Sequence, residues 1–426
     1  MIRTALASIL LLTASDAIAQ VLLEPSVPAT RAEPLVEKIF GEEVADPYRW
    51  LENDARSDAE VADWIARQNA ATESLMQQLP GRDWFAQRIA GLMDFERFGI
   101  PRKAGTNYFF TRNSGLLNQA QLYVQAGLDG ERRLLLDPNL WSSDGATALA
   151  AWEPSPDGKL LAYSVQEAGS DWRTIRVIDV ATGRQLGDDI RWAKFTSIAW
   201  VGREGLLYSR FPEPAAGEDL RAVSLDQAVW FHRIGTAQAA DRMVFATPSH
   251  PERSHVARTT HDGRWAVITS SVGMADRHEI HLLDLARRGK DRWEARPLVT
   301  GCAHSWRLVE SLDGQLHFVT DEGAPRQRIL AADLDHRRPR WREVVAETGE
   351  QISGASIVGQ RLVVEYVNDA DTTAMVFDTA GQAVGRLAVA GMGAAGGFRG
   401  SPADSETFYS FTSFNRPASV YRLDLA

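Results

Sequence analysis

Residues 34–92 carry apolar side chains at helical spacing. A capping-box spacing of Ser57 and Glu60 predicts that a helix begins there, with Ser57 as its N-cap. Pro80–Gly81 predicts its end and the start of a second, shorter helix. The apolar positions lie three or four residues apart, and they are Val61, Trp64, Ile65, Leu75, Met76 and Leu79 in the first helix and Trp84, Phe85, Ile89 and Leu92 in the second.

Two helices offer each other little surface, so we expect part of this apolar stripe to lie uncovered. Exposed apolar patches of this kind usually mark a contact with a partner. The expected patch consists of Trp50, Leu51, Trp64, Ile65, Leu75 and Met76.

From about Ile100 onward the pattern changes to short alternating strands separated by turns, many of them Asp-Gly. Seven strands of this type begin 45 to 58 residues apart, just after Gly105, Gly158, Gly205, Gly263, Gly314, Gly359 and Ser405. A second strand follows each of them, at 122–130, 175–183, 229–235, 280–285, 328–334, 374–381 and 419–425.

This repeat predicts the fold. Seven units of about 50 residues, each with two paired strands, are typical of a propeller with four-stranded blades. The alternative is a β-sandwich, which rarely continues through some fourteen matched strands. We therefore expect a mainly β protein, with a seven-bladed β-propeller at residues 100–426 preceded by a short α-helical segment at residues 20–99.

The first 19 residues have the pattern of a signal peptide. Arg3 supplies the positive start, residues 4–14 the apolar run, and Ala17-Ile18-Ala19 a small-residue cleavage site. A membrane anchor is the alternative, but the apolar run is much shorter than the roughly 20 residues that span a bilayer. We expect cleavage after Ala19 and a periplasmic or secreted protein.

Composition narrows the function classes. The chain has 46 Lys and Arg against 56 Asp and Glu, a net charge of −10, which argues against a nucleic-acid or anionic membrane partner. Cys302 is the single cysteine, which excludes intrachain disulfides and paired-cysteine zinc or redox sites. We expect no metal and no cofactor.

Several long motifs resemble the prolyl oligopeptidase family of serine peptidases. Residues 46–52 (DPYRWLE) are similar to its N-terminal signature, and the run from Ser155 to Val177 is similar to its second blade. Further blades match in order at residues 191–200 (RWAKFTSIAW), 206–214, 229–245 and 408–425. The resemblance covers the chain from about residue 34 to its end.

The resemblance implies a propeller that caps an α/β-hydrolase domain carrying Ser, Asp and His. In the family the propeller restricts access to short peptides, the hydrolase cleaves after proline, and the N-terminal helical segment packs on the hydrolase domain. The position that matches Phe195 resembles an aromatic residue facing the active-site cavity, so Phe195 is a candidate substrate-binding residue. Ordinary blade core is the alternative for Phe195.

The chain departs from the family where the hydrolase domain would begin, because it stops at Ala426. A nucleophilic serine of that fold needs a G-x-S-x-G elbow. No serine here has glycine at both positions; Ser356 comes nearest, with Gly354 before it and Val358 after it. We therefore assign no catalytic residue and expect a chain that lacks the catalytic domain and is inactive alone, which leaves its status as an enzyme open.

Three other patterns have ordinary structural interpretations. Gly391 to Gly396 spells G-x-G-x-x-G, but no helix can follow, so we expect a loop rather than a dinucleotide site. His278 and His281 are expected as surface histidines on opposite faces of a strand. The acidic pairs Glu42-Glu43 and Asp188-Asp189 are expected as solvated turn charges.

Two functions remain. The first is the gating, substrate-selecting propeller of an exported prolyl-oligopeptidase-like peptidase, which would act on short proline-containing peptides once a hydrolase domain, encoded separately or downstream, is supplied. The alternative is a stand-alone periplasmic propeller that binds a peptide or protein partner. A cofactor-dependent propeller enzyme is a weaker third option, because no cluster of histidines or carboxylates stands out near the strand starts.

Overall fold

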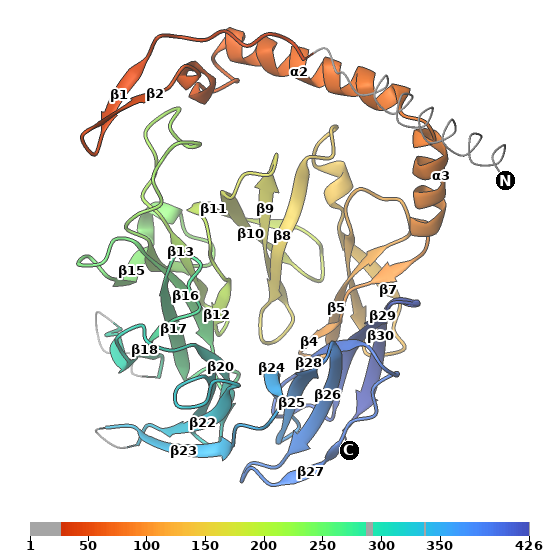
Figure 1. Cartoon of the computed structure of the whole chain (residues 1–426). Coiled ribbons are helices and arrows are strands. Elements are labelled where there is room, and N and C mark those ends of the chain that lie inside the picture. Colours follow the sequence, from red (N-terminus) through yellow and green to blue (C-terminus); the bar gives the residue numbers. More distant parts are fainter. Residues whose placement is uncertain (1–26, 287–292, 336–337, 426) are drawn as a thin grey trace, which may run out of the picture. The chain divides into compact units, whose positions relative to one another are not determined.

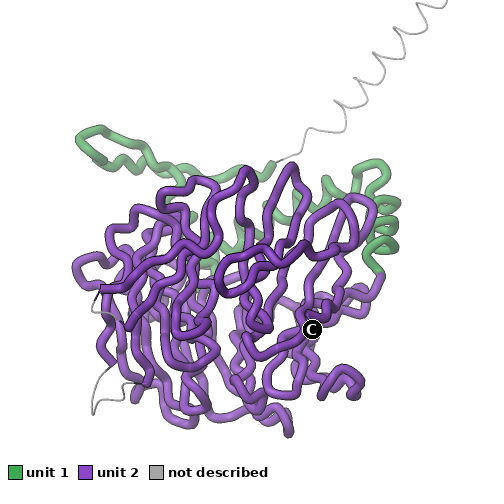
Figure 2. The backbone as a smooth tube through the Cα atoms, turned by 90° about the horizontal axis from the view of Figure 1, so that it is seen from below, with its two compact units in different colours: residues 1–94 green, residues 95–426 purple. Residues whose placement is uncertain are grey.

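The computed structural model describes residues 27–286, 293–335 and 338–425. They fall into two compact units, divided between Asp94 and Phe95 (Figure 2). The sequence placed this division between residues 99 and 100. The predicted signal peptide lies outside the described residues.

The first unit contains the predicted helices and one hairpin. Its elements are β1 (Val36–Ile39), β2 (Glu42–Ala45), the short 3₁₀ helix η1 (Arg49–Glu52), α2 (Ala59–Gln78) and α3 (Arg82–Met93). Strands β1 and β2 pair in antiparallel register, from Val36 opposite Ala45 to Ile39 opposite Glu42. Among the described residues, no helix is long and apolar enough to cross a membrane.

The N-cap of α2 differs from the prediction. Asp58, not Ser57, caps the helix, because its carboxylate accepts hydrogen bonds from the amides of Glu60 and Val61. The Ser57 hydroxyl instead donates to the carbonyl of Asp54 at 3.2 Å. A carboxylate at this position also interacts favourably with the positive end of the helix dipole.

The apolar stripe of the first unit is covered differently from the prediction. Residues 28–31 run beside α2: the Trp64 indole donates to the Thr30 hydroxyl at 2.9 Å, and the Trp50 indole donates to the carbonyl of Arg31 at 2.9 Å. Trp50 is therefore buried, and the expected patch was wrong to include it. Ile65 and Met76 of the expected patch are exposed on α2, and the apolar side chains of α3, Trp84, Phe85, Ile89 and Leu92, are exposed as well.

The second unit consists almost entirely of antiparallel sheets (Figure 1). The first sheet contains β3 (Arg97–Phe98), β4 (Arg102–Ala104), β5 (Asn107–Asn113), β6 (Gln121–Ala126) and β7 (Arg132–Leu136). An eight-stranded sheet follows, with β8 (Thr147–Pro154), β9 (Leu160–Glu167), β10 (Arg173–Asp179), β11 (Gln185–Ala193), β12 (Ala199–Val201), β13 (Gly205–Arg210), β14 (Ala228–Arg233) and β15 (Arg242–Ala246).

The remaining sheets are smaller. The third sheet contains β16 (Arg253–Thr259), β17 (Trp265–Val272), β18 (Glu279–Asp284) and β19 (Arg296–Val299), and the fourth contains β20 (Trp306–Leu312), β21 (Gln315–Thr320), β22 (Arg328–Asp333) and β23 (Arg340–Val345). The fifth contains β24 (Gln351–Val358), β25 (Arg361–Asn368), β26 (Asp371–Phe377) and β27 (Ala383–Arg386). The last sheet contains β28 (Ala394–Arg399), β29 (Glu406–Ser413) and β30 (Arg416–Asp424). Two short 3₁₀ helices, η2 (Pro138–Leu140) and η3 (Gln238–Ala240), lie in connections.

All seven predicted strand pairs are present as antiparallel neighbours, from β5 with β6 to β29 with β30. The propeller fold is therefore confirmed. The expected seven separate four-stranded blades are not: the described residues form five sheets of four or more strands and one of three.

Edge pairing explains the different count. The second and third predicted units share the eight-stranded sheet, because β11 meets β13 through one pair, Ala193 opposite Arg210. In the first sheet, β3 and β4 both pair with β5, and the last sheet has three strands. Such edge contacts depend on tertiary packing, which the local alternation of residues does not encode.

The core of this unit lies mainly between successive sheets. Buried apolar clusters join the first sheet to the eight-stranded sheet, that sheet to β16–β18, and so on to β28–β29. One further cluster lies within the eight-stranded sheet. The last sheet also contacts the first, through β30 and β3, so the sheets form a closed ring.

Two turns of adjacent sheets touch backbone to backbone. Gly105, with φ +57°, lies against Asp157, and a Cβ built on it would stand 2.4 Å from the Asp157 carbonyl oxygen. Gly158, with φ +68°, lies against Ala104, and its Cβ would stand 2.3 Å from that carbonyl oxygen. Glycine is required at both turns for its left-handed conformation and for its lack of a side chain.

Candidate functional site

An aromatic cluster lies where three loops meet at one edge of the eight-stranded sheet. The loops are those before β10, between β11 and β12, and between β13 and β14. The rings pack edge to face: Trp172 lies 5.5 Å from Trp192 and 6.3 Å from Phe211, and Phe195 lies 6.4 Å from Phe211. The predicted residue Phe195 is thus part of this cluster, hereafter the loop aromatic cluster.

Phe195 has an unusual backbone for a large side chain. Its φ is +52° and that of Trp192 is +61°, in the left-handed region that residues other than glycine rarely adopt. The Gln227 amide holds the loop by donating to the carbonyl of Lys194 at 2.7 Å and to that of Phe195 at 3.4 Å. In this conformation Phe195 is about half exposed to solvent, at 48%.

Lys194 adds a positive charge to the cluster. Its ammonium lies 5.1 Å from the ring centres of both Trp172 and Phe195, a distance at which cation–π attraction operates. The same group donates to the Ser224 hydroxyl at 3.1 Å and lies 4.0 Å from the Asp171 carboxylate. The cluster therefore offers an exposed aromatic face beside a fixed cation, which suits the apolar groups and carbonyls of a peptide.

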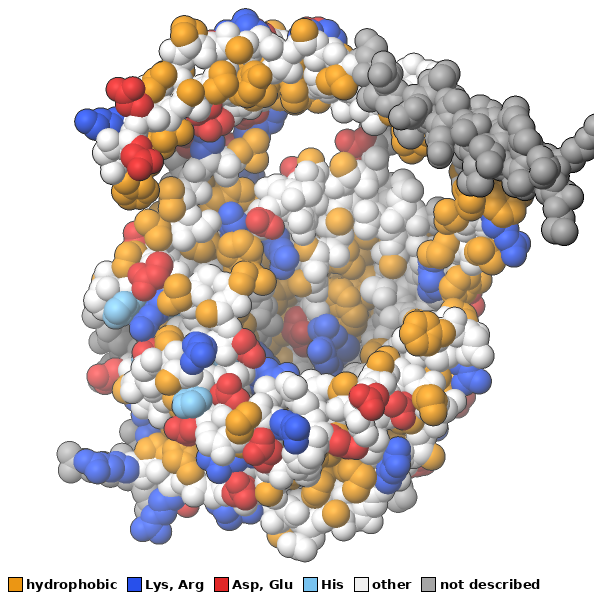
Figure 3. All heavy atoms as spheres, in the orientation of Figure 1, with side chains coloured by type: hydrophobic (Ala, Val, Ile, Leu, Met, Phe, Trp, Pro, Cys, Tyr) orange, Lys and Arg blue, Asp and Glu red, His pale blue; other side chains and the backbone are white. Residues whose placement is uncertain are grey.

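A hollow occupies the middle of the ring of sheets, and both acidic and basic side chains are visible inside it (Figure 3). Edge strands of the sheets supply charged residues to it, among them Arg102 of β4 and Glu153 of β8, whose side chains form an ion pair at 2.6 Å.

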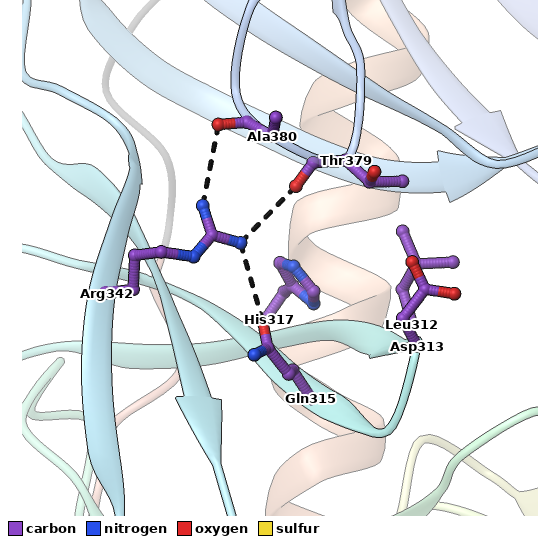
Figure 4. Close-up of a pocket in the computed structure, with 7 residues that line it drawn as sticks. All are labelled: Leu312, Asp313, Gln315, His317, Arg342, Thr379 and Ala380. Atoms are coloured by element: carbon purple, nitrogen blue, oxygen red, sulfur yellow. Dashed lines mark hydrogen bonds between the residues drawn. The ribbon is translucent and has the colours of Figure 1, made fainter.

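A second, shallow pocket of about 350 Å³ lies at the hairpin between β20 and β21. Its lining residues are Leu312, Asp313, Gln315, His317, Arg342, Thr379 and Ala380 (Figure 4). Arg342 reaches across to the carbonyls of Thr379 and Ala380 and to the Gln315 amide oxygen, at 3.4 to 3.5 Å. Burial, helped by the Arg342 charge, lowers the pKa of His317. Arg342 thus links two neighbouring sheets, and the pocket holds no nucleophile paired with a base.

The serine and histidine pairs of the described residues do not form a hydrolytic site. Ser356 of β24 donates its hydroxyl to the carbonyl of Phe398 on β28, in the neighbouring sheet. Ser270 and His255 do contact each other, with Oγ and Nδ1 2.8 Å apart, but both are fully buried. Burial lowers the pKa of His255 to about 4, and its other nitrogen faces the Thr247 hydroxyl rather than a carboxylate. The Ser270–His255 pair is therefore structural.

His232 bridges two carboxylates inside the eight-stranded sheet. Its Nδ1 lies 2.7 Å from Asp241 and its Nε2 2.9 Å from Asp188, and Tyr208 donates to Asp241 at 2.7 Å. Burial opposes protonation, but the two carboxylates prevail and raise the pKa of His232 to about 9. The interpretation of Asp188 as a solvated turn charge is wrong, because this side chain is fully buried.

The other patterns with alternative interpretations resolve as follows. His278 accepts from the Trp306 amide at 3.0 Å and the His281 ring packs 4.6 Å from Phe245, so both are partly buried rather than on the surface. Within the described residues, no group of three or more His, Cys, Asp or Glu side chains could hold a metal ion. The glycine-rich run enters strand β28 at Ala394, not a helix.

Sequence reasoning named Phe195 as a candidate but not the aromatic residues that pack around it. Trp172 and Phe211 stand just outside strands, where a buried core aromatic is less expected, and this was the available signal; Trp192 lies within β11 and gave no such signal. The convergence of three loops could not be read from spacing.

Comparison with known proteins identifies the fold's relatives. The sequence profile of the prolyl oligopeptidase N-terminal β-propeller domain matches residues 27–426. The prolyl endopeptidase of Elizabethkingia miricola is 31% identical over 399 residues, and that of Elizabethkingia meningoseptica is 30% identical over the same length. Each match covers 93% of this chain and 55% of the relative, so the chain spans about half the length of these curated relatives.

Solved structures agree. A structure from a study of two prolyl endopeptidases and their inter-domain dynamics is 43% identical, with a TM-score of 0.73, covering 94% of this chain and 57% of the other. Prolyl oligopeptidase B from Galerina marginata, solved with a 35-residue substrate, shares the fold with a TM-score of 0.82 at 24% identity, over 94% of this chain and 59% of the other. The chain belongs to the prolyl oligopeptidase family, whose N-terminal β-propeller domain it contains.

Proposed function

We propose that this chain is the gating and substrate-selecting propeller of an exported prolyl-oligopeptidase-like serine peptidase. In this role the propeller admits short proline-containing peptides to a hydrolase domain that carries the Ser, Asp and His residues. The observation that supports the proposal best is the family match over residues 27–426.

The loop aromatic cluster gives the propeller a substrate contact. A bulky residue in a left-handed conformation costs on the order of 1–3 kcal/mol, and such outliers concentrate at functional sites. Phe195 meets this description and also presents its ring to solvent. We propose that it packs against apolar groups of the peptide, while Lys194 orients a peptide carbonyl. Neither residue breaks bonds.

A chimera tests the gating role. Residues 27–426 would replace the propeller of the Elizabethkingia miricola prolyl endopeptidase, and hydrolysis would be measured on a proline-containing chromogenic tripeptide and on the same motif within a folded protein. We expect cleavage of the tripeptide and little cleavage of the protein. Cleavage of both at equal rates would contradict a gating role and leave the stand-alone binding protein.

Phe195→Ala in the chimera tests the substrate contact. Loss of one aromatic contact costs about 0.5–1.5 kcal/mol, so we expect KM for the tripeptide to rise about twofold to thirteenfold with kcat unchanged. Phe414→Ala is the matched control, because Phe414 is fully exposed in the turn between β29 and β30. An unchanged KM in Phe195→Ala would remove Phe195 from the proposal.

The 426-residue chain by itself should not cleave the same tripeptide, because no nucleophile elbow is present in its sequence. Turnover that is abolished by an organophosphate serine-hydrolase inhibitor would contradict this expectation. Export is tested separately: the mature protein from a periplasmic fraction should begin at Gln20, and an intact Met1 would contradict it.

A further inference from the structure

A cluster of charged side chains faces the hollow of the propeller, hereafter the inner charge cluster. Most of its members lie on edge strands of different sheets. The cluster consists of Arg102, Glu153, Arg258, Arg307, Glu310, Glu365 and Arg399.

Members of this cluster interact electrostatically although they lie on sheets that do not contact each other. This places the cluster at the centre of the ring of sheets. Glu153 lies on β8 and Arg258 on β16, yet both interact electrostatically with Arg399 on β28. The sheet of β28 adjoins the β24–β27 sheet and the first sheet, not those of β8 or β16. These interactions therefore cross the hollow seen in Figure 3.

The carboxylates of the cluster are already occupied. Glu153 accepts from Arg102 at 2.6 Å. Glu310 is buried and accepts from the amides of His261 at 3.0 Å and Ser311 at 2.8 Å. Glu365 interacts with the amides of Gly397 and Phe398. Each of these carboxylates therefore already has a partner of its own within the cluster or the neighbouring backbone.

Two arginines, by contrast, have donors to spare. Arg258 donates one N–H to the carbonyl of Leu308 at 2.7 Å, and within the described chain no carboxylate lies within 4 Å of it. The side chain of Arg399 makes no hydrogen bond or ion pair to the described residues, and both side chains reach solvent. A guanidinium carries five N–H donors, so most donors of this pair are free of protein partners.

The local charge favours a monoanion. Four arginines and three glutamates give the cluster a net charge of +1, in a chain whose net charge is −10. Guanidinium groups match the two oxygens of a carboxylate, and partial enclosure strengthens that attraction. A phosphate dianion would fit less well, because Glu153 lies close to the same arginines. We propose that Arg258 and Arg399 bind the carboxylate of a short peptide in the hollow.

This inference rests on the proposed function for the source of the carboxylate, but its test does not. Binding of N-acetyl-diglycine and of its C-terminal amide to the full chain would be measured by isothermal titration calorimetry at low salt. The two probes differ only in the carboxylate. We expect the acid to bind at least tenfold more tightly, which corresponds to about 1.4 kcal/mol.

Arg399→Gln is the main variant, because among the described residues this side chain interacts with Glu153 and Glu365 through its charge but makes no hydrogen bond or ion pair whose loss would disturb folding. We expect it to weaken binding of the acid about tenfold and to leave binding of the amide unchanged. Arg191→Gln is the matched control, since Arg191 is exposed and paired with Asp189 at 3.1 Å. Arg399→Lys, which keeps the charge but loses the fork, should fall between the two.

Equal affinity for acid and amide, or an Arg399→Gln variant that binds as the unmodified chain does, would overturn the proposal. Tighter binding of inorganic phosphate than of the acid would assign the site to a free phosphate and overturn the peptide carboxylate. If the chimera fails to show gating while the acid and amide still differ, the inner charge cluster stands and the proposed function falls.

Discussion

The propeller ring is joined in two chemically different ways. Between the β16–β19 and β20–β23 sheets a buried apolar cluster spans the junction, with Phe318 fully buried among Trp306, Leu282 and Leu330, and polar contacts such as the one from the His261 amide to Glu310 accompany it. Between the last sheet and the first sheet, none of the buried apolar clusters spans the junction. Besides the edge-to-face contact of Tyr108 with Phe408 at 5.8 Å, this closing junction relies on Glu406, which accepts from the Tyr108 hydroxyl and pairs with Arg422 and, at 3.6 Å, with Lys103.

The difference teaches where such a ring can open. Apolar burial is insensitive to pH and depends on area, whereas a buried ion network depends on every partner being charged and present. Lys103 also pairs with Asp404 at 3.1 Å, so a small set of opposite charges contributes to holding the closing junction. We therefore expect the apolar junctions to determine global stability and the closing junction to control local opening.

Phe318→Ala should produce the largest effect. Removing a fully buried phenylalanine and leaving a cavity costs about 3–5 kcal/mol in the free energy of unfolding. Urea denaturation followed by tryptophan fluorescence measures this loss. Phe414→Ala is the control and should change the unfolding free energy by less than about 0.5 kcal/mol. A loss below about 1 kcal/mol in Phe318→Ala would remove the distinction between the junctions.

Raising the pH should weaken the bridge that His232 makes between two carboxylates inside the eight-stranded sheet. The folded-state pKa of His232 is about 9, above the 6.5 of an unfolded histidine. The stabilisation is complete below pH 6.5 and is lost as the pH rises through about 9, on the order of 2–3 kcal/mol in all. Denaturation midpoints from pH 6 to 10 should show this decline, and His232→Gln should abolish it. A flat profile in the unmodified chain would contradict the protonated bridge.

Glu406→Gln should open the closing junction without unfolding the ring. The substitution removes the negative charge that pairs with Lys103 and Arg422. It should lower the free energy of opening this junction by about 2 kcal/mol. Hydrogen exchange should accelerate in β3–β5 and β29–β30 and stay unchanged in β20–β23. Glu343→Gln, at an exposed pair with Arg328, is the control. Uniform acceleration over all sheets would show that this junction is not a separate weak point.

Lowering the pH should also open the closing junction, but by less than the substitution of Glu406. Burial favours protonation of Glu406, but its hydrogen bonds with Tyr108 and Arg422 and the charge of Lys103 hold its pKa below the ordinary 4.5. Its contribution is therefore complete above about pH 4.5 and is lost as the pH falls through the lowered value. Hydrogen exchange at pH 6 and pH 4 should show β29–β30 losing protection before β21–β22. The reverse order would contradict the comparison.

Local pattern predicted the strands well because alternation is encoded residue by residue. All fourteen predicted strands exist, since each needs only its own apolar face and a turn. The fusion of two units into one sheet escaped prediction because it depends on one edge pair, Ala193 with Arg210.

The site was predictable only in part, for the same reason. Phe195 came from a family resemblance, not from its surroundings. The burial of Asp188 depends on His232, 44 residues away, and a carboxylate in a polar run looks solvated until that partner is known. Likewise, both Ser57 and Asp58 can accept a hydrogen bond at the start of a helix. The path of the chain into the helix decides between them, and here it makes Asp58 the cap.

The paired glycines at 105 and 158 have a consequence for how this chain tolerates mutation. Gly105 is exposed, and exposed positions normally accept most substitutions with little cost. Here a methyl group at either glycine would collide with the backbone of the other turn, so the harm would appear in the neighbouring sheet as well as at the altered residue. In a saturation-mutagenesis library, these two turn positions should thus show the intolerance of core residues, and substituting both should do less harm than the sum of the single changes.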